Sequence, residues 1–390
     1  MDEGAPDTPP ATGAAAVVPV GAEGVLPSQL LERAIAAGWI GATYDKIPAA
    51  AIQPASVDLR LGERAYRVRA SFLPDDDTVE AKLDDLVVDE LDLRDEGAVL
   101  ETNRPYLIPL IEELALPPGV RARTNPKSST GRLDVFTRVI TDHSYRFDEI
   151  DAGYQGRLWL EVVPLSFTVR VKHRLALNQL RLVSGRAGLT DEELHERHAR
   201  EPFLFRGDAP VSDDELATAD GLFLSLDLQG DESGRVGYRA KGNAPLLDMS
   251  QVGTHAPHDY WEPVPPEGGD RIILDPERFY LLLSDESVRV PPDLAAEMTA
   301  YDPTSGELRT HYAGFFDPGF GYDREGVMHG SRAALEVRAH DVPFLIEHRQ
   351  PVCKLTFERM IEPPTKLYGA DIGSNYQGQV ETLGKHFRRV

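Results

Sequence analysis

Apolar and polar positions alternate over short stretches through most of the chain, and proline, glycine and aspartate separate one stretch from the next. Alternation with a period of two is typical of strands. The clearest examples are ASVDLRLG, PYLIPL, RLDVFTRVI, GRLWLEVVPL, FTVRV and QLRLV. Helical spacing is clear over residues 27–38, where Ser28 can cap the first turn and Gly38 follows the last. We therefore expect a mainly β protein with a few short helices.

The chain contains an internal repeat. Tyr-Leu pairs begin at Tyr106 and Tyr280, about 174 positions apart, and a Pro-Pro pair follows each of them at the same distance. Leu-Glu-Val triplets around Glu161 and Glu336 come next, preceded by the turns IDAGYQG and FDPGFGY. A period this long excludes a solenoid, so we predict a duplicated domain.

A stretch of different composition, residues 187–262, separates the two repeats. LTDEELHERHAREPF predicts an acidic helix, and GDESGRVGYRAKGNAP predicts a hairpin and loop. His195 and His198 stand three positions apart on that helix. A metal site needs more ligands than these two, so a solvated helical face is the favoured interpretation.

Composition and charge narrow the classes of function. The 390 residues include 41 Lys and Arg against 64 Asp and Glu, and the resulting net charge of −23 disfavours a nucleic-acid partner. The single Cys353 can form no internal disulfide, and the chain has no Cys/His set for zinc. No apolar run is long enough for a membrane helix, and residues 1–25 lack the apolar core of a signal peptide. We expect a cytoplasmic protein that binds neither membranes nor zinc.

The stretch NPKSSTGRLDVFTR, residues 125–138, is the first candidate for chemistry. Hydroxyls and backbone N–H groups in a glycine-containing turn, with Lys127 and Arg132 at its ends, form a plausible phosphate cradle. The order of residues is not that of a P-loop. A polar turn capped by a surface arginine remains the alternative.

Two carboxylates follow this motif. Glu161 lies in GRLWLEVVP, a stretch that is apolar on both faces, so we expect its side chain to be buried. Burial brings a carboxyl pKa toward the range in which it can accept and return a proton near neutral pH. A glutamate paired with a nearby arginine is the open alternative. Asp151 precedes a glycine, and an aspartate in that position commonly just makes a turn.

Four motifs in order resemble those of the dCTP deaminase branch of the dUTPase-like superfamily, in its long, double-domain bacterial form. They are IQPASVDLRLG (52–62), KSSTGR (127–132), IDAGYQGRLWLE (150–161) and YGADIGSNYQGQ (368–379). The resemblance implies duplicated β-barrel domains of jelly-roll type. The expected organisation is a disordered tail (1–25), a first domain with the catalytic motifs (26–186), an insertion (187–262), a degenerate second domain (263–362) and a C-terminal lid (363–390).

The resemblance also implies an activity, the hydrolytic deamination of dCTP to dUTP and ammonia without zinc, which supplies dUTP for dTMP synthesis. Glu161 matches the residue that activates water, and Ser128 and Arg132 match residues that position the water and the phosphates. The resemblance further implies Mg²⁺ on the substrate triphosphate and a homo-oligomer, either a homotrimer or a pseudo-trimeric assembly of repeats. Residues expected to bind the substrate are Lys127, Ser129, Asp151, Tyr368, Asn375 and Gln379.

Departures from the family pattern limit this transfer. Lys127 stands where the family has arginine, and Asn375 stands where its lid has lysine. In the second repeat, YDPTSGELR (301–309) replaces KSSTGR and introduces acids that repel phosphate, although Glu336 is retained. We therefore expect the second domain to complete a pseudo-oligomeric interface and to supply the lid. His143 could fall in the base pocket.

Two other functions are alternatives to deamination alone. A bifunctional enzyme would also hydrolyse dUTP to dUMP and pyrophosphate, and a non-catalytic dNTP sensor would bind without chemistry. A sensor has no need for a buried proton shuttle, so Glu161 argues against it. Analysis of the products separates an enzyme that only deaminates dCTP from the bifunctional one.

Overall fold

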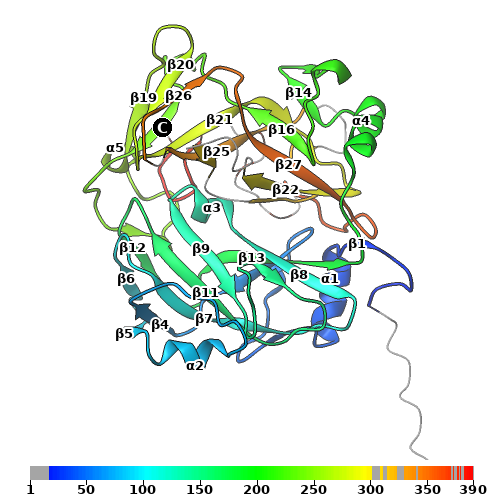
Figure 1. Cartoon of the computed structure of the whole chain (residues 1–390), viewed down its shortest axis with the longest axis vertical. Helices are drawn as coiled ribbons and strands as arrows, with labels where there is room; N and C mark the ends of the chain where they lie inside the picture. The colour runs from blue at the N-terminus through cyan, green and yellow to red at the C-terminus, as the bar shows by residue number, and fades with distance from the viewer. Residues whose placement is uncertain are drawn as a thin grey trace, which may run out of the picture.

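A computed structural model describes residues 17–300, 308–310, 314–322, 329–339, 341–369, 372, 376, 378 and 382–389. The chain forms two β-rich halves, with the short helix α3 (Ser128–Gly131) lying where they meet (Figure 1). The expectation of a mainly β, duplicated fold with few short helices is confirmed. None of the helices in the described ranges is both long and apolar enough to cross a membrane.

The first half is built on two antiparallel sheets that enclose a shared apolar core. One sheet has the order β1-β13-β8-β10, with β3 also beside β13. The other has the order β5-β4-β7-β11-β9, with β2 also beside β7. Their strands are β1 (Gly24–Val25), β2 (Ile40–Ala42), β3 (Val57–Arg60), β4 (Arg64–Val68), β5 (Val87–Asp92), β7 (Tyr106–Ala115), β8 (Val120–Pro126), β9 (Val135–Ile140), β10 (Glu149–Ile150), β11 (Gln155–Pro164) and β13 (Ala176–Ser184).

Short elements complete this half. The expected first helix is present as α1, whose buried face includes Leu30 and Leu31. A three-stranded sheet, β18-β12-β6, joins it to a strand from beyond residue 186. The elements are α1 (Ser28–Ala36), the 3-10 turn η1 (Ala49–Ala51), α2 (Val79–Leu83), β6 (Ala98–Leu100), β12 (Val169–Val171) and β18 (Leu247–Asp248).

The second half repeats the plan with a second apolar core. Its larger sheet contains β15-β14-β21-β17-β19 together with β25 and β23, and its smaller sheet has the order β16-β27-β22-β24. Strands β20 and β26 form a separate ribbon. The strands are β14 (Leu204–Arg206), β15 (Ala209–Pro210), β16 (Leu222–Ser225), β17 (Gly237–Ala240), β19 (Trp261–Val264), β20 (Arg271–Leu274), β21 (Phe279–Val288), β22 (Leu294–Ala300), β23 (Leu308–Thr310), β24 (Gly314–Phe316), β25 (Ser331–Ala339), β26 (Phe344–Glu347) and β27 (Pro351–Arg359).

The strand register shows that the two halves are true repeats. Glu161 on β11 stands opposite Leu107 on β7, and Glu336 on β25 stands opposite Leu281 on β21. The two Leu-Glu-Val triplets therefore occupy equivalent positions of equivalent hairpin pairs.

Residues 187–262, expected as an insertion, supply strands to the second half. Strands β14 and β17 both pair with β21, and β16 pairs with β27. We therefore assign most of this segment to the second half, because without it two sheets would lose interior or edge partners, whereas β18 pairs with β12 of the first half. Its other elements are α4 (Asp191–Arg200), the 3-10 turn η2 (Asp213–Glu215) and α5 (Pro257–Tyr260).

The two histidines of α4 have structural roles. A capping box between Thr190 and Glu193 begins the helix, as its acidic first turn favours. His198 is buried, and its Nε2 lies 2.8 Å from the carbonyl oxygen of Val211. The expected solvated helical face therefore describes His195 better than His198. The Nδ1 of His195 lies 2.6 Å from a carboxylate oxygen of Asp213.

The halves meet through buried ionic contacts and a small apolar cluster. Arg123 on β8 contacts Glu297 and Glu358 of the second half, and Arg181 on β13 contacts Glu358 at 3.4 Å. The apolar cluster is formed by Val25, Ala55, Val183, Ala187, Ala295 and Met360. Charged groups at such depth cost desolvation, and mutual pairing offsets that cost.

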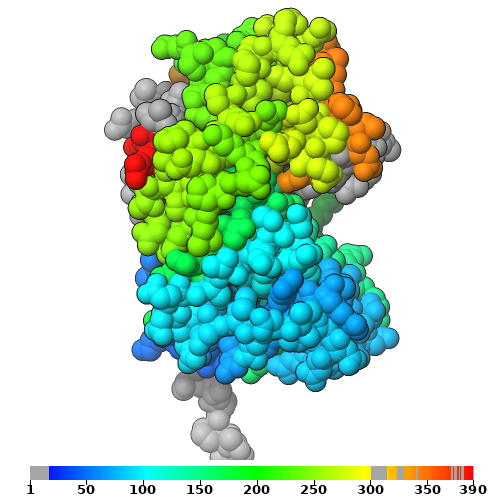
Figure 2. Space-filling view, turned by 90° about the vertical axis from the view of Figure 1, so that its left-hand side faces the viewer, coloured from blue at the N-terminus to red at the C-terminus, as the bar shows by residue number. Residues whose placement is uncertain are grey.

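The end of the chain is fastened to the segment before β19. Gly253 N donates to Lys385 O at 2.9 Å, and Arg388 N donates to His255 O at 2.9 Å. Phe387 is buried against aromatic rings of α5 and β19. Figure 2 shows the red C-terminal residues lying against the yellow-green segment of the second half. Residues 382–389 therefore form a docked strap.

Candidate functional site

A pocket with an open volume of about 590 Å³ lies between the two halves. The first half contributes residues at the end of β8 and in α3, and the second half contributes β24, the turn after it and β25. The lining residues are Pro126, Lys127, Ser128, Gly131, Arg132, Met298, Gly314, Phe315, Phe316, Asp317, Phe320, Ala333, Ala334, Glu336, Tyr368 and Tyr376.

The KSSTGR motif forms a single helical turn at the pocket wall. Strand β8 ends at Pro126, and the turn is closed by Arg132 N donating to Ser128 O at 3.1 Å. The Thr130 hydroxyl donates to Leu177 O at 2.8 Å, which fastens the turn to β13. Lys127 is held by an ion pair with Asp58 from the SVDLRLG stretch. Two of the sequence motifs are therefore in contact.

Arg132 is almost fully buried, with 4% of its surface exposed. Its Nη1 donates to Thr382 O at 3.0 Å, and its guanidinium lies 3.9 Å from the ring centroid of Tyr376. Within the described parts of the chain, its Nε has no hydrogen-bond partner. A buried donor without a partner is suited to an anionic ligand.

Glu336 faces this arginine from the second half. It lies on β25 and is 7% exposed. Burial raises the pKa of its carboxyl to about 7, the positive charge of Arg132 opposes that rise, and Asp134 adds to it. A carboxyl with such a pKa can exchange a proton near neutral pH.

Glu161, the expected water activator, lies in a different environment. Its carboxylate accepts hydrogen bonds from Arg138 at 2.9 and 2.5 Å, and the ring of Phe147 covers that guanidinium at 3.6 Å. Glu161 lies on the same face of β11 as Trp159, which packs beneath α2. The alternative of a glutamate paired with an arginine therefore describes Glu161, and it does not line the pocket that contains Ser128 and Arg132.

The two aspartate turns also differ. Asp151 is exposed, and its carbonyl oxygen accepts a turn hydrogen bond from Tyr154 N at 3.2 Å. Its counterpart Asp317 is buried, lines the pocket and accepts a hydrogen bond from Arg181 at 3.2 Å. Burial raises the pKa of Asp317, and Arg181 opposes this effect. The turn of the second repeat is thus the one at the pocket.

The remaining expected residues fall into four groups. Lys127, Ser128, Arg132 and Tyr368 line the pocket, whereas Ser129 is buried in the same turn without lining it. Asn375 and Gln379 lie outside the described residues. His143 is exposed, and its Nδ1 lies 2.9 Å from Asp76 O, away from the pocket residues.

Sequence reasoning missed Asp317, Tyr376 and Lys385. The repeat was the available signal for Asp317, because FDPGFGY aligns with IDAGYQG. Lys385 is half-buried on the C-terminal strap, and its backbone N donates to the Tyr376 hydroxyl at 3.4 Å. Burial and the neighbouring charge of Lys127 lower the pKa of Lys385. A third cation, besides Lys127 and Arg132, therefore lies near the KSSTGR turn, although position 375 carries no lysine.

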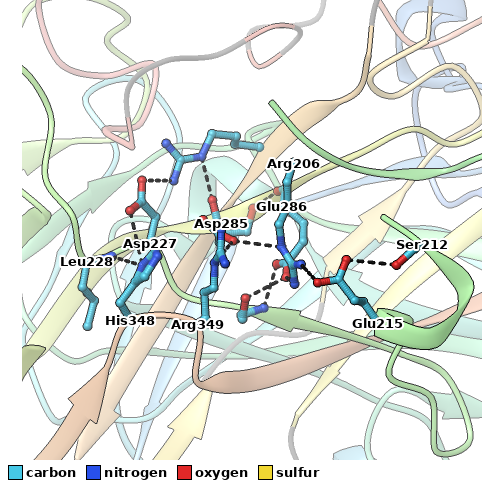
Figure 3. Close-up of polar contacts among 12 residues, drawn as sticks. Arg206, Ser212, Glu215, Asp227, Leu228, Asp285, Glu286, His348 and Arg349 are labelled. Carbon is cyan, nitrogen blue, oxygen red and sulfur yellow. Dashed lines mark hydrogen bonds and ion pairs between the residues drawn. The ribbon is translucent and has the colours of Figure 1, made fainter. Parts of the chain in front are cut away.

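A cluster of metal-ligand type lies elsewhere in the second half. Asp227, Asp285 and His348 bring three ligand atoms within 4.8 Å of one another. Figure 3 shows Asp285 between Arg206 and Arg349, at 3.1 and 3.0 Å. Asp227 also pairs with Arg332 at 2.7 Å. Arginines already neutralise these carboxylates, so the cluster is interpreted as an ionic network of the fold.

Comparisons with known proteins agree with this division into two halves. Models of the N-terminal and C-terminal domains of 2′-deoxycytidine 5′-triphosphate deaminase match residues 22–186 and 190–387. The crystal structure of 2′-deoxycytidine 5′-triphosphate deaminase from Agrobacterium tumefaciens superposes with a TM-score of 0.81 at 45% identity, covering 88% of this chain and 99% of that one.

Curated relatives match over shorter regions. A dUMP-forming dCTP deaminase of Halobacterium salinarum is 33% identical over 117 residues, which is 29% of this chain and 55% of the relative. One of Parafrankia sp., also named dUMP-forming, is 32% identical over 161 residues, or 40% of this chain and 72% of the relative. The match to the first of these thus spans about half of its length.

The two domain models together with the crystal structure that covers both halves give one conclusion: the chain belongs to the 2′-deoxycytidine 5′-triphosphate deaminase family, in its long, double-domain form.

Proposed function

We propose that the chain deaminates dCTP to dUTP and ammonia in the pocket between its halves, with Glu336 rather than Glu161 as the residue that activates water. One observation carries the proposal: Glu336 is a buried carboxyl whose pKa is near neutrality, in the same pocket as Ser128 and Arg132. Family membership supplies the substrate class.

The cationic end of the pocket suits the triphosphate. Lys127 supplies a point charge, and the buried Nε of Arg132 is a donor without a partner among the described residues. The Ser128 hydroxyl adds a neutral donor beside them. Planar guanidinium groups bind phosphate oxygens in a fixed geometry, so Arg132 sets orientation as well as affinity.

The opposite wall suits a nucleoside. Phe315, Phe316 and Phe320 offer aromatic surface against which a base and a sugar can pack, and Asp317 adds a polar edge. Sites of this kind combine an apolar lining with a few convergent polar groups.

The chemistry follows from the state of Glu336. When ionised, the carboxylate accepts a proton from water as the water oxygen bonds to C4 of cytosine. Glu336 delivers this proton to N3. It then takes the proton of the new C4 hydroxyl and passes it to the amino group, so that the C4–O double bond forms as the C4–N bond breaks and ammonia leaves. Arg132 favours the ionised, reactive form of the carboxyl. None of these proposed reaction steps uses zinc.

Mg²⁺ enters the proposal only as a companion of the triphosphate. In the described cradle, the Asp58 carboxylate is already paired with Lys127. Asp317 is bonded to Arg181, and Glu336 is assigned to the proton transfers. These residues do not form a carboxylate set for a protein-held Mg²⁺.

A second candidate is suggested by the relatives named dUMP-forming, which would mean that dUTP is also hydrolysed to dUMP and pyrophosphate. Incubation with dCTP and Mg²⁺, followed by chromatography of nucleotides and assays of ammonia and pyrophosphate, separates the possibilities. dUTP with ammonia and no pyrophosphate supports deamination alone. Ammonia with dUMP and pyrophosphate supports the bifunctional reaction, and binding of dCTP without ammonia release supports a sensor.

The described pocket draws residues from both halves of one chain, so the proposed site needs no second copy for Glu336, Ser128 and Arg132 to meet. The homo-oligomer suggested by the family stays a prediction, which sedimentation of the purified protein would test.

A further inference from the structure

Arg181 is a fully buried arginine that the proposed chemistry does not use. It lies on β13 of the first half with 0% of its side chain exposed, yet its guanidinium contacts the second half. Its Nη1 donates to Ala296 O on β22 at 3.2 Å and to Glu358 on β27 at 3.4 Å. Its Nη2 donates to Asp317 at 3.2 Å.

Two of the groups that Arg181 contacts are walls of the pocket. Its guanidinium lies 3.9 Å from the ring centroid of Phe315, and its Nη2 holds the carboxylate of Asp317. Both residues line the pocket, and both are buried. A planar guanidinium that stacks on the ring of Phe315 and donates a hydrogen bond to Asp317 fixes the positions of both side chains.

Arg123 provides an internal comparison. It stands directly opposite Arg181 in the β13–β8 register and pairs with Glu297 and Glu358 across the same interface. Neither of those glutamates lines the pocket. The two arginines therefore share the task of joining the halves, but only Arg181 reaches the pocket wall.

We propose that Arg181 is a positioning residue of the site, which holds Phe315 and Asp317 in the geometry that orients the bound nucleoside. The kinetic part of this proposal rests on the proposed function, whereas the positioning itself does not. A displacement of about 1 Å at such a wall can cost on the order of 100-fold in rate.

The test compares the full-length variants Arg181→Met and Arg123→Met. Both lose a buried ionic contact, so both should lower the melting temperature by similar amounts. Hydrogen–deuterium exchange then reports on the turn itself through the amides of Gly319 and Phe320, which donate to Val290 O and Asp317 O. We expect exchange at least about tenfold faster in Arg181→Met and unchanged in Arg123→Met.

Steady-state kinetics with dCTP supply the second arm. We expect kcat to fall on the order of 100-fold in Arg181→Met, with KM changed far less, and both constants to stay within about threefold in Arg123→Met. Arg181→Lys, which keeps the charge without the planar fork, should fall between Arg181→Met and the wild type and serves if Arg181→Met does not fold.

The outcomes are separable. A wild-type protein that releases no ammonia from dCTP contradicts the proposed function, and the exchange experiment still decides the role of Arg181. The positioning role is overturned if the turn exchanges at the same rate in the two methionine variants. If Arg181→Met does not fold, equal exchange in Arg181→Lys and the wild type overturns it instead.

Discussion

Exchanging each of the two equivalent glutamates for glutamine should give opposite results. Glu336→Gln removes the proposed base, and general base catalysis is worth about 10²–10⁴-fold in rate, or about 3–5 kcal/mol of barrier. Ammonia release from dCTP should fall by at least this factor. Glu161→Gln should leave kcat/KM within about threefold, because Glu161 is paired with Arg138 outside the pocket.

The free energy of unfolding should change in the opposite sense to the activity: Glu336→Gln should be more stable than the wild type, and Glu161→Gln should be less stable. The pKa of Glu336 is raised from 4.5 to about 7, so folding is favoured most when the group is protonated and this advantage is lost as pH rises through 7. At pH 8 the ionised carboxyl costs about 3 kcal/mol, a penalty that Glu336→Gln removes. Glu161→Gln leaves Arg138, whose side chain is 25% exposed, without its carboxylate. Discounted for that exposure, the loss is about 2 kcal/mol.

The assay combines coupled ammonia detection with denaturant unfolding at pH 8 for the two variants and the wild type. We expect Glu336→Gln to be inactive but more stable than the wild type, and Glu161→Gln to be active but less stable. Loss of ammonia release in Glu161→Gln with normal release in Glu336→Gln would contradict the assignment of the base to Glu336 and would place the base in the first repeat.

Three further predictions concern charge at the site and at the strap. For the wild type, kcat/KM with dCTP should rise with pH through about 7 as Glu336 ionises, and a profile that is flat from pH 5 to 9 would contradict this. Arg132→Gln should lower kcat/KM by at least about tenfold. It should also shift the rise of kcat/KM to higher pH, because Arg132 lowers the pKa of Glu336. A rise at the same pH as in the wild type would argue against an interaction between the two groups. Burial lowers the pKa of His386 from 6.5 to about 3, so stability is complete above pH 6.5 and is lost as pH falls toward 3. At pH 5 the loss is about 2 kcal/mol, and His386→Gln should show a correspondingly smaller loss in unfolding between pH 7.5 and 5.

The fold was largely accessible from the sequence. Alternation of apolar positions identified most central strands, and the paired Tyr-Leu, Pro-Pro and Leu-Glu-Val signals gave the duplication. The segment 187–262 was predicted as an insertion and not as strands of the second half, because its strands are short and interrupted by acidic loops. Strand β17, for example, has only four residues, and its pairing with β21 depends on contacts distant in sequence.

The site was accessible only in part. KSSTGR could be predicted as an anion cradle because its chemistry is local, and Lys127, Ser128 and Arg132 do line the pocket. The resemblance assigned the base to Glu161, but the strand pattern does not separate Glu161 from Glu336, because both lie in equivalent Leu-Glu-Val strands. Only the packing of one half against the other places Glu336 beside Arg132, and only Arg138 reveals that Glu161 is engaged elsewhere.

The central claim is that the first repeat binds the phosphates while the second supplies the base. A crystal structure of the Glu336→Gln variant with dCTP and Mg²⁺ tests it most directly. We expect the triphosphate to contact residues 127–132 and C4 of cytosine to lie within about 4 Å of the side chain at position 336. A cytosine ring placed beside Glu161 and Arg138 would contradict it.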